Sequence, residues 1–204
     1  MSAPKVIATQ VTLASKSAAR RALLEGAGVA AELCVSGVDE EAAKAERLAR
    51  GEGPRAIAEA LAELKAVAVS KARPGFVVGA DQTLEFEGAL FDKVETLAAA
   101  RERLALLRGR PHRLHSAVVV AKDGAPVWGE TVSATLHMRD FSDAFLAHYL
   151  AVEGEAALGS VGCYRLEAMG AQLFARIEGD YFAILGLPLL GLLDFLRREG
   201  ALAA

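Results

Sequence analysis

The chain has 204 residues, of which 53% are hydrophobic and 24% are charged, and its formal net charge is −3. These values are typical of one globular domain or of two tightly joined lobes, and we expect a single domain over residues 1–204. The slightly negative charge disfavours a nucleic-acid partner, because no basic field is available to hold a phosphate backbone. The apolar stretches are too short to span a bilayer, and residues 1–10 lack the pattern of a secretory signal. We therefore expect a cytoplasmic protein without a membrane partner.

The two cysteines, Cys34 and Cys163, lie far apart and outside any CxxC spacing. This usage is typical of a reducing compartment and does not suggest a disulfide framework. We expect both side chains to be buried and chemically inert.

The first part of the chain predicts strands and helices in alternation. An apolar, β-branched run over residues 6–14 predicts a buried strand, Ser17 suits the N-cap of a helix that stops at residues 26–28, and residues 31–35 predict a short second strand. The charged stretch 39–53 predicts an exposed loop with some helix.

A longer helix is predicted from Pro54 to about residue 73. Its inward stripe is expected at Ile57, Leu61, Leu64 and Ala68, with Lys65 at the border of that stripe.

From residue 76 onward, hairpins dominate. A compact strand is predicted at 76–79, with Ala80-Asp81-Gln82 leaving it, and a hairpin follows that turns at Glu87-Gly88. Further predicted elements are a helix at 96–107, two long strands at 112–121 and 126–138, a helix at 142–151, short elements at 173–177 and 181–185, and a helix at 189–198. We expect an α/β fold with a mixed sheet flanked by helices.

Ser15, Lys16, Ser17 and Arg20 gather where the first predicted strand meets its helix. Free backbone amides and the helix dipole favour an anion at such a junction, and these side chains would add donors. The alternative is an ordinary N-cap with solvated cations, so the cluster alone leaves both interpretations open.

Asp81 follows a buried strand, at a position where α/β sheets commonly bind ligands. A carboxylate there can hold Mg²⁺ or Mn²⁺, or accept a proton from an attacking water. With a two-residue turn at Glu87-Gly88, the register pairs Gln82 with Lys93 and brings a lysine beside Asp81. The alternative role for Asp81 is to cap a turn.

Other chemistries find little support. His112 and His115 are three residues apart, which on a strand sends them to opposite faces and disfavours a shared metal. The chain contains no GxSxG nucleophile elbow, no Walker A spacing and no strand-associated GxGxxG.

Several short motifs, taken together and in order, resemble the Maf family over nearly the whole chain. They are Leu13-Ala14-Ser15-x-Ser17-x-x-Arg20, Val38-Asp39-Glu40, Leu64-Lys65-Ala66, Gly79-Ala80-Asp81-Gln82, Lys93, Gly109-Arg110-x-His112, Gly159-Ser160-x-Gly162-x-Tyr164, and Ile177–Tyr181 with Gly186-Leu187-Pro188. The resemblance implies an elongated sheet with a cleft between two lobes, a homodimer, and hydrolysis of a nucleoside triphosphate to monophosphate and pyrophosphate.

The resemblance also implies residue roles. Asp81 matches the catalytic carboxylate, and Asp81 with Glu40 is expected to hold the divalent metal. The residues that match the substrate-binding positions are Ser15, Arg20, Glu40, Lys65 and Lys93.

Ala19, Gln82 and Glu167 match the family's specificity positions. Gln82 and Glu167 resemble the branch that acts on 7-methyl-GTP, and a glutamate can accept hydrogen bonds from the N1 and N2 donors of guanine. Ala19 departs from both branches, so a preference for dTTP or UTP stays open. A nucleotide-binding regulator of cell division and a phosphohydrolase that releases orthophosphate are the alternatives to a pyrophosphatase.

Overall fold

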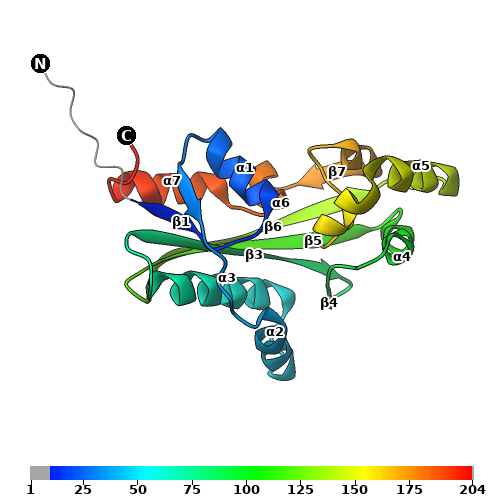
Figure 1. Ribbon diagram of the computed structural model, residues 1–204. Helices are drawn as coiled ribbons and strands as arrows, with labels where there is room; N and C mark the ends of the chain where they lie inside the picture. Colours follow the sequence, from blue (N-terminus) through cyan, green and yellow to red (C-terminus); the bar gives the residue numbers. More distant parts are fainter. Residues whose placement is uncertain (1–9, 204) are drawn as a thin grey trace, which may run out of the picture.

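Residues 10–203 are described by the computed structural model, and they form a mixed α/β structure around one seven-stranded sheet (Figure 1). The sheet order is β2-β1-β3-β5-β6-β7, and β4 pairs with β3 on the same edge as β1. β1 is parallel to β2 and β3, whereas the other pairs are antiparallel, which confirms the predicted mixed sheet. The strands are β1 (Val11–Leu13), β2 (Ala31–Leu33), β3 (Phe76–Phe86), β4 (Ala89–Phe91), β5 (Pro111–Lys122), β6 (Ala125–Met138) and β7 (Phe174–Glu178).

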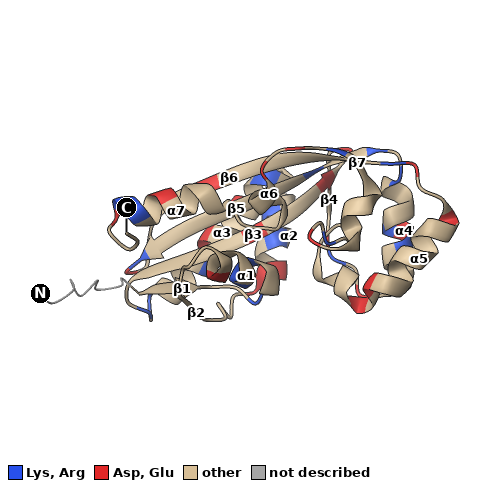
Figure 2. Ribbon diagram, turned by 90° about the horizontal axis from the view of Figure 1, so that it is seen from above, with Lys and Arg blue, Asp and Glu red and all other residues tan. Residues whose placement is uncertain are grey.

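Helices cover both faces of the sheet and one of its ends. The helix α3 lies on one face, whereas α1, α6 and α7 lie on the other (Figure 1). At the end remote from α7, α4 and α5 lie side by side (Figure 2). The helices are α1 (Ala18–Gly26), α2 (Glu40–Ala49), α3 (Pro54–Ser70), α4 (Leu97–Leu107), α5 (Asp143–Glu153), α6 (Tyr181–Ile184) and α7 (Leu189–Arg198), with 3-10 turns at Gly154–Gly159 and Met169–Leu173.

Of the first predicted strand, residues 11–13 form β1 and residues 10 and 14 lie outside it, whereas residues 6–9 are outside the described part of the chain. Ser17 caps α1 as predicted, because its side chain accepts a hydrogen bond from the backbone of Arg20. Residues 39–53 contain more helix than the exposed loop with some helix that was predicted. α2 is a ten-residue helix capped by Asp39, and it lacks a buried residue to give it an apolar stripe in the sequence.

The inward face of α3 differs from the prediction. Ile57 and Leu61 are buried as expected, but Leu64 is 38% exposed and Lys65 takes its place on the buried face. Alanines line the rest of this face and pack against β5 through Ala58, Ala62, Ala66, Ala117, Val119 and Ala121. These small side chains let the helix lie close to the sheet, so the side chain of Lys65 can contact Asp81 of β3.

β3 does not end at Gly79 as predicted but runs on without a break, so Asp81 lies in the middle of the strand. The predicted turn at Glu87-Gly88 is confirmed, with φ of 52° and 81°. β1 stops opposite Val78, and β4 begins to pair only opposite Leu84. Between them, one edge of β3 is left without a neighbouring strand, and Asp81 lies at that open edge.

Two apolar clusters stabilise the two ends of the sheet. One joins α1 and α7 to β1, β3 and β5, and the other joins α4 and α5 to the distal ends of β3, β5 and β6. Cys163 is buried as expected, whereas Cys34 is only half-buried, contrary to the prediction, and both thiols are free. Within residues 10–203 the structure contains no helix that is long and apolar enough to cross a membrane.

Gly79 sets the distance between α3 and the sheet. A Cβ atom at this position would lie 2.2 Å from the carbonyl oxygen of Ala62 and 2.6 Å from the amide of Ala66. We expect Gly79→Ala to lower the free energy of unfolding by ~1–3 kcal/mol, because the backbone of α3 would have to move. In β6, Gly129 is an exposed strand glycine whose nearest contact would be 3.4 Å, so Gly129→Ala is the matched control. Equal urea-denaturation midpoints for the two variants would contradict this account.

We expect His112 to lower the free energy of unfolding in mild acid. It lies in the distal core with its Nε2 atom 2.6 Å from the Tyr164 hydroxyl, and burial lowers the pKa of its imidazole from 6.5 to about 4. Between those pH values the unfolded chain binds the extra proton, so stability is present above pH 6.5 and is lost as the pH falls. This residue should contribute ~2 kcal/mol to the loss between pH 7 and pH 5.

Urea titrations of His112→Gln at pH 7 and pH 5 measure this contribution. The variant should lose less stability between the two pH values than the wild type does. His148→Gln removes an exposed histidine and should keep the wild-type difference.

Candidate active site

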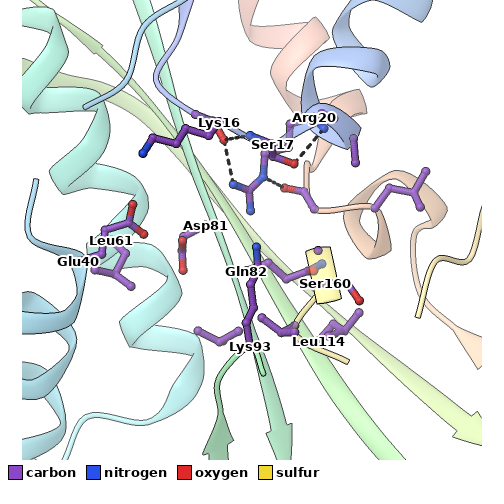
Figure 3. A pocket seen from close by; sticks show the side chains of 18 of the residues that line it. Lys16, Ser17, Arg20, Glu40, Leu61, Asp81, Gln82, Lys93, Leu114 and Ser160 are labelled. Carbon is purple, nitrogen blue, oxygen red and sulfur yellow. Dashed lines mark hydrogen bonds between the residues drawn. The ribbon is translucent and has the colours of Figure 1, made fainter. Parts of the chain in front are cut away.

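A pocket of about 1240 Å³ opens at the uncovered edge of β3. Its size suits a nucleotide-sized ligand. Figure 3 shows side chains from α1, α2, α3, β3 and the segment after β4 around the same cavity. All the residues that the sequence indicated for a site line it: Ser15, Ala19, Arg20, Glu40, Lys65, Asp81, Gln82, Lys93 and Glu167.

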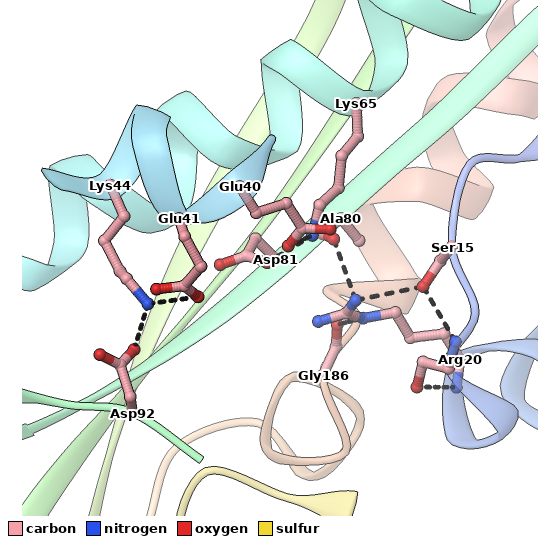
Figure 4. Close-up of polar contacts among 11 residues, drawn as sticks. Ser15, Arg20, Glu40, Glu41, Lys44, Lys65, Ala80, Asp81, Asp92 and Gly186 are labelled. Atoms are coloured by element: carbon pink, nitrogen blue, oxygen red, sulfur yellow. Dashed lines mark hydrogen bonds and ion pairs between the residues drawn. The ribbon is translucent and has the colours of Figure 1, made fainter. Parts of the chain in front are cut away.

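Lys65 is the centre of a buried ion-pair cluster. Its ammonium lies 2.7 Å from Asp81 Oδ1 and 2.6 Å from Glu40 Oε2 (Figure 4). Only 7% of the Lys65 side chain and 13% of the Asp81 side chain are exposed, against 46% for Glu40. A lysine buried to this degree requires such partners, because desolvation of an unpaired ammonium is costly. The cluster fixes the Asp81 carboxylate and connects α2, α3 and β3.

Arg20 holds the opposite wall through backbone carbonyl groups. Its guanidinium donates to Ala80 O at 2.9 Å, to Gly186 O at 2.7 Å and to Ser15 Oγ at 3.3 Å (Figure 4). Burial lowers the pKa of Arg20, although attraction to Asp81 and Glu40 opposes this effect. Arg20 therefore brings a positive charge to the pocket and also joins α1 to the open edge of β3 and to the loop after α6.

Lys93 approaches from the segment between β4 and α4. The β3–β4 ladder ends at the pair Leu84–Phe91, so the predicted pairing of Gln82 with Lys93 is not part of it, although its register points there. Lys93 keeps much of its surface accessible within the pocket. Partial desolvation lowers the pKa of its ammonium, and repulsion from Arg20 adds to this effect. Lys93 is thus placed among other cations, where a polyanion would relieve the repulsion.

The three expected specificity residues have different surroundings. Ala19 lies on the first turn of α1 at the pocket wall. Alternation along β3 turns Gln82 away from the face of Asp81, and its amide nitrogen donates to Ser116 Oγ, Ala183 O and Ile184 O. This amide holds α6 against the sheet. Glu167 is exposed in the pocket and pairs with Arg165 at 3.3 Å.

Lys44, Asp92 and Arg103 shape the same site but were missed by the sequence analysis. Lys44 and Asp92 line the pocket and are ion-paired at 2.7 Å, and Arg103 binds the backbone of the segment that carries Lys93. These contacts join positions that are far apart in the chain. The position of Asp92 directly before Lys93 was the one signal in the sequence.

The donor groups fit a cation that is shared with a ligand. Glu40 and Asp81 each place an oxygen within 2.7 Å of the Lys65 ammonium, so the two carboxylates face the same part of the pocket. No set of three or more histidine, cysteine or acidic residues with metal-binding geometry occurs from residue 10 to residue 203. Two carboxylates fit Mg²⁺, which usually takes one or two protein carboxylates together with phosphates and waters.

Comparison with known proteins identifies the family. The family described as "Maf-like protein" matches residues 10–199. A nucleoside triphosphate pyrophosphatase of Caulobacter vibrioides is 62% identical over 95% of this chain and 98% of its own length, and one of Granulibacter bethesdensis is 54% identical over the same shares. A 7-methyl-GTP pyrophosphatase of Brucella abortus is 45% identical over 93% of this chain and 96% of its own length. The chain belongs to the Maf family.

Proposed function

We propose that this protein hydrolyses 7-methyl-GTP to its monophosphate and pyrophosphate. The coarser activity follows from family membership and from relatives of high identity: the chain is a nucleoside triphosphate pyrophosphatase. The observation that carries the assignment of the site is a convergence of charges. Arg20, Lys65 and Lys93 surround the Asp81 carboxylate in a single pocket.

The residues divide into charge neutralisation and proton transfer. Arg20 and Lys93 bind the phosphate oxygens, and Ser15 adds a hydroxyl at the same wall. Lys65 occupies Asp81 Oδ1, and the second oxygen, Oδ2, makes no hydrogen bond within the described chain. Asp81 Oδ2 accepts the proton of the water that attacks the α-phosphorus, and pyrophosphate leaves. Alignment and charge neutralisation supply most of the acceleration, because phosphoryl transfer asks for little covalent work from the protein.

Glu40 and Asp81 would hold a divalent cation, Mg²⁺ or Mn²⁺, which arrives with the triphosphate. Such an ion, when bound, neutralises the charge that develops on the phosphates. Glu40 is half-exposed at the pocket side of the cluster, so it is free to move from the Lys65 ammonium to the ion.

The base preference rests on Glu167. A carboxylate accepts hydrogen bonds from the N1 and N2 donors of a guanine, and it also attracts the positive charge that methylation places on the ring. The name of the Brucella abortus relative supports this choice. The relatives of higher identity have names that specify no base.

Asp81→Asn tests the catalytic role. The amide cannot accept the proton, so we expect kcat to fall about 10²- to 10⁴-fold at saturating Mg²⁺. Asp123→Asn is the control, because Asp123 lies in the β5–β6 turn away from the pocket. Turnover is followed by chromatography of pyrophosphate and orthophosphate separately. Wild-type turnover in Asp81→Asn would contradict the mechanism, and orthophosphate as the first product would contradict the reaction.

Glu167→Gln tests the base preference. We expect kcat/KM for 7-methyl-GTP to fall about 10-fold, while the values for dTTP and UTP stay constant or rise, because a glutamine amide can both donate and accept. The panel contains 7-methyl-GTP, GTP, dTTP and UTP, with the Asp123→Asn protein as the reference. A wild-type protein that prefers dTTP or UTP would overturn the assigned base and leave the reaction intact.

A further inference from the structure

Lys93 depends on its neighbours for its position. Its ammonium makes no hydrogen bond or ion pair with any residue between 10 and 203, and it stands after the end of β4, where strand pairing has stopped. Arg20 and Lys65 repel this ammonium, whereas Asp81 and Glu40 attract it. Because no direct contact fixes the ammonium, its place in the pocket depends on what holds the backbone of residues 91–93.

Lys44 holds this segment from the side of α2. α2 has no fully buried residue, yet the Lys44 side chain is only 11% exposed. Its ammonium lies 2.7 Å from Asp92 Oδ1 and 2.8 Å from Glu41 Oε1 (Figure 4). The ion pair with Asp92 joins α2 to the residue directly before Lys93.

Arg103 holds the same segment from the side of α4. One guanidinium nitrogen donates to Asp92 O and to Val161 O, each at 2.9 Å. The guanidinium carbon also lies 4.5 Å from the centre of the Phe91 ring. Asp92 is thus fixed through both its side chain and its backbone, and the Val161 contact ties it to the loop that carries Glu167.

We propose that Lys44, Asp92 and Arg103 are positioning residues that hold Lys93 in place for polyphosphate binding. This inference rests on the proposed function, because it names how that site is prepared for its substrate. We call these three residues the brace. Pre-organisation of a charged side chain lowers the entropy that binding must remove, so the brace acts on affinity more than on the chemical step.

The direction in which Asp92→Asn changes the affinity for a polyanion distinguishes a positioning role from a purely electrostatic one. Asp92 lines the pocket, so its negative charge should repel a polyanion, and Asp92→Asn by electrostatics alone would strengthen binding. Loss of the brace predicts the opposite, namely a KM about 10-fold higher with kcat within about threefold, because one charge-assisted contact from Lys93 is weakened. In a Lys93→Met background, Asp92→Asn should no longer weaken binding.

The experiment measures KM and kcat for the preferred triphosphate, and by calorimetry with Mg²⁺ present the Kd of inorganic tripolyphosphate, for the wild type, Asp92→Asn, Lys93→Met and the double variant. Asp143→Asn is the matched control, because it removes an exposed aspartate that pairs with Arg108 at 2.7 Å outside the pocket. Lys44→Gln provides a second route to the same result: it should weaken binding in the wild type but not in the Lys93→Met background.

Unchanged or stronger binding by Asp92→Asn overturns the proposal, and so does a weakening of equal size in the Lys93→Met background. The proposed function fails separately, if the wild-type protein releases no pyrophosphate. In that case the tripolyphosphate measurements still decide whether the brace exists.

Discussion

The buried ammonium of Lys65 is the constraint on which the arrangement of the pocket depends. An ammonium that is almost fully removed from water must be neutralised, and here the charge is shared by Asp81 of β3 and Glu40 at the start of α2. α2 has little apolar surface with which to pack, so the pairs of its glutamate and of Lys44 orient it. The same cluster restricts the rotation of the Asp81 carboxylate, which the proposed role of Asp81 as a general base requires.

A gap in the sheet creates the space for this chemistry. β3 runs past the end of β1 and meets β4 only six residues later along its length, from Val78 to Leu84. Ala80 O at the open edge is satisfied by the guanidinium of Arg20. Because alternate residues of a strand point to opposite faces, Asp81 turns to Lys65 while Gln82 turns to α6. The tripeptide Ala80-Asp81-Gln82 thus contacts the elements on both sides of the pocket.

The sequence was sufficient for the element order, for the mixed sheet and for a set of residues that meet in one pocket. Local chemistry explains these successes, since Ser17 caps a helix and Glu87-Gly88 makes a tight turn. Prediction from the sequence failed where contacts between distant parts of the chain determine the burial of a residue or the length of a strand. Lys65 interrupts an apolar face only because two carboxylates neutralise it. β3 continues through Gly79 because β5 pairs with it from Val77 to Glu85. The Lys44–Asp92 pair spans 48 positions and leaves no periodic signal.

The charges that line the pocket are balanced, with six basic and six acidic side chains, yet they are not evenly distributed. Lys65 and Lys44 each face two carboxylates, so both of these clusters carry a net negative charge. Arg20 and Lys93 have no ion-pair partner among the described residues. A free triphosphate would gain little from a pocket without net charge. A triphosphate that carries a divalent cation would match both parts at once, since the cation meets the Lys65 cluster and the phosphates meet Arg20 and Lys93. This distribution of charge is what the proposed function requires if the metal complex of the nucleotide, rather than the free nucleotide, is the substrate.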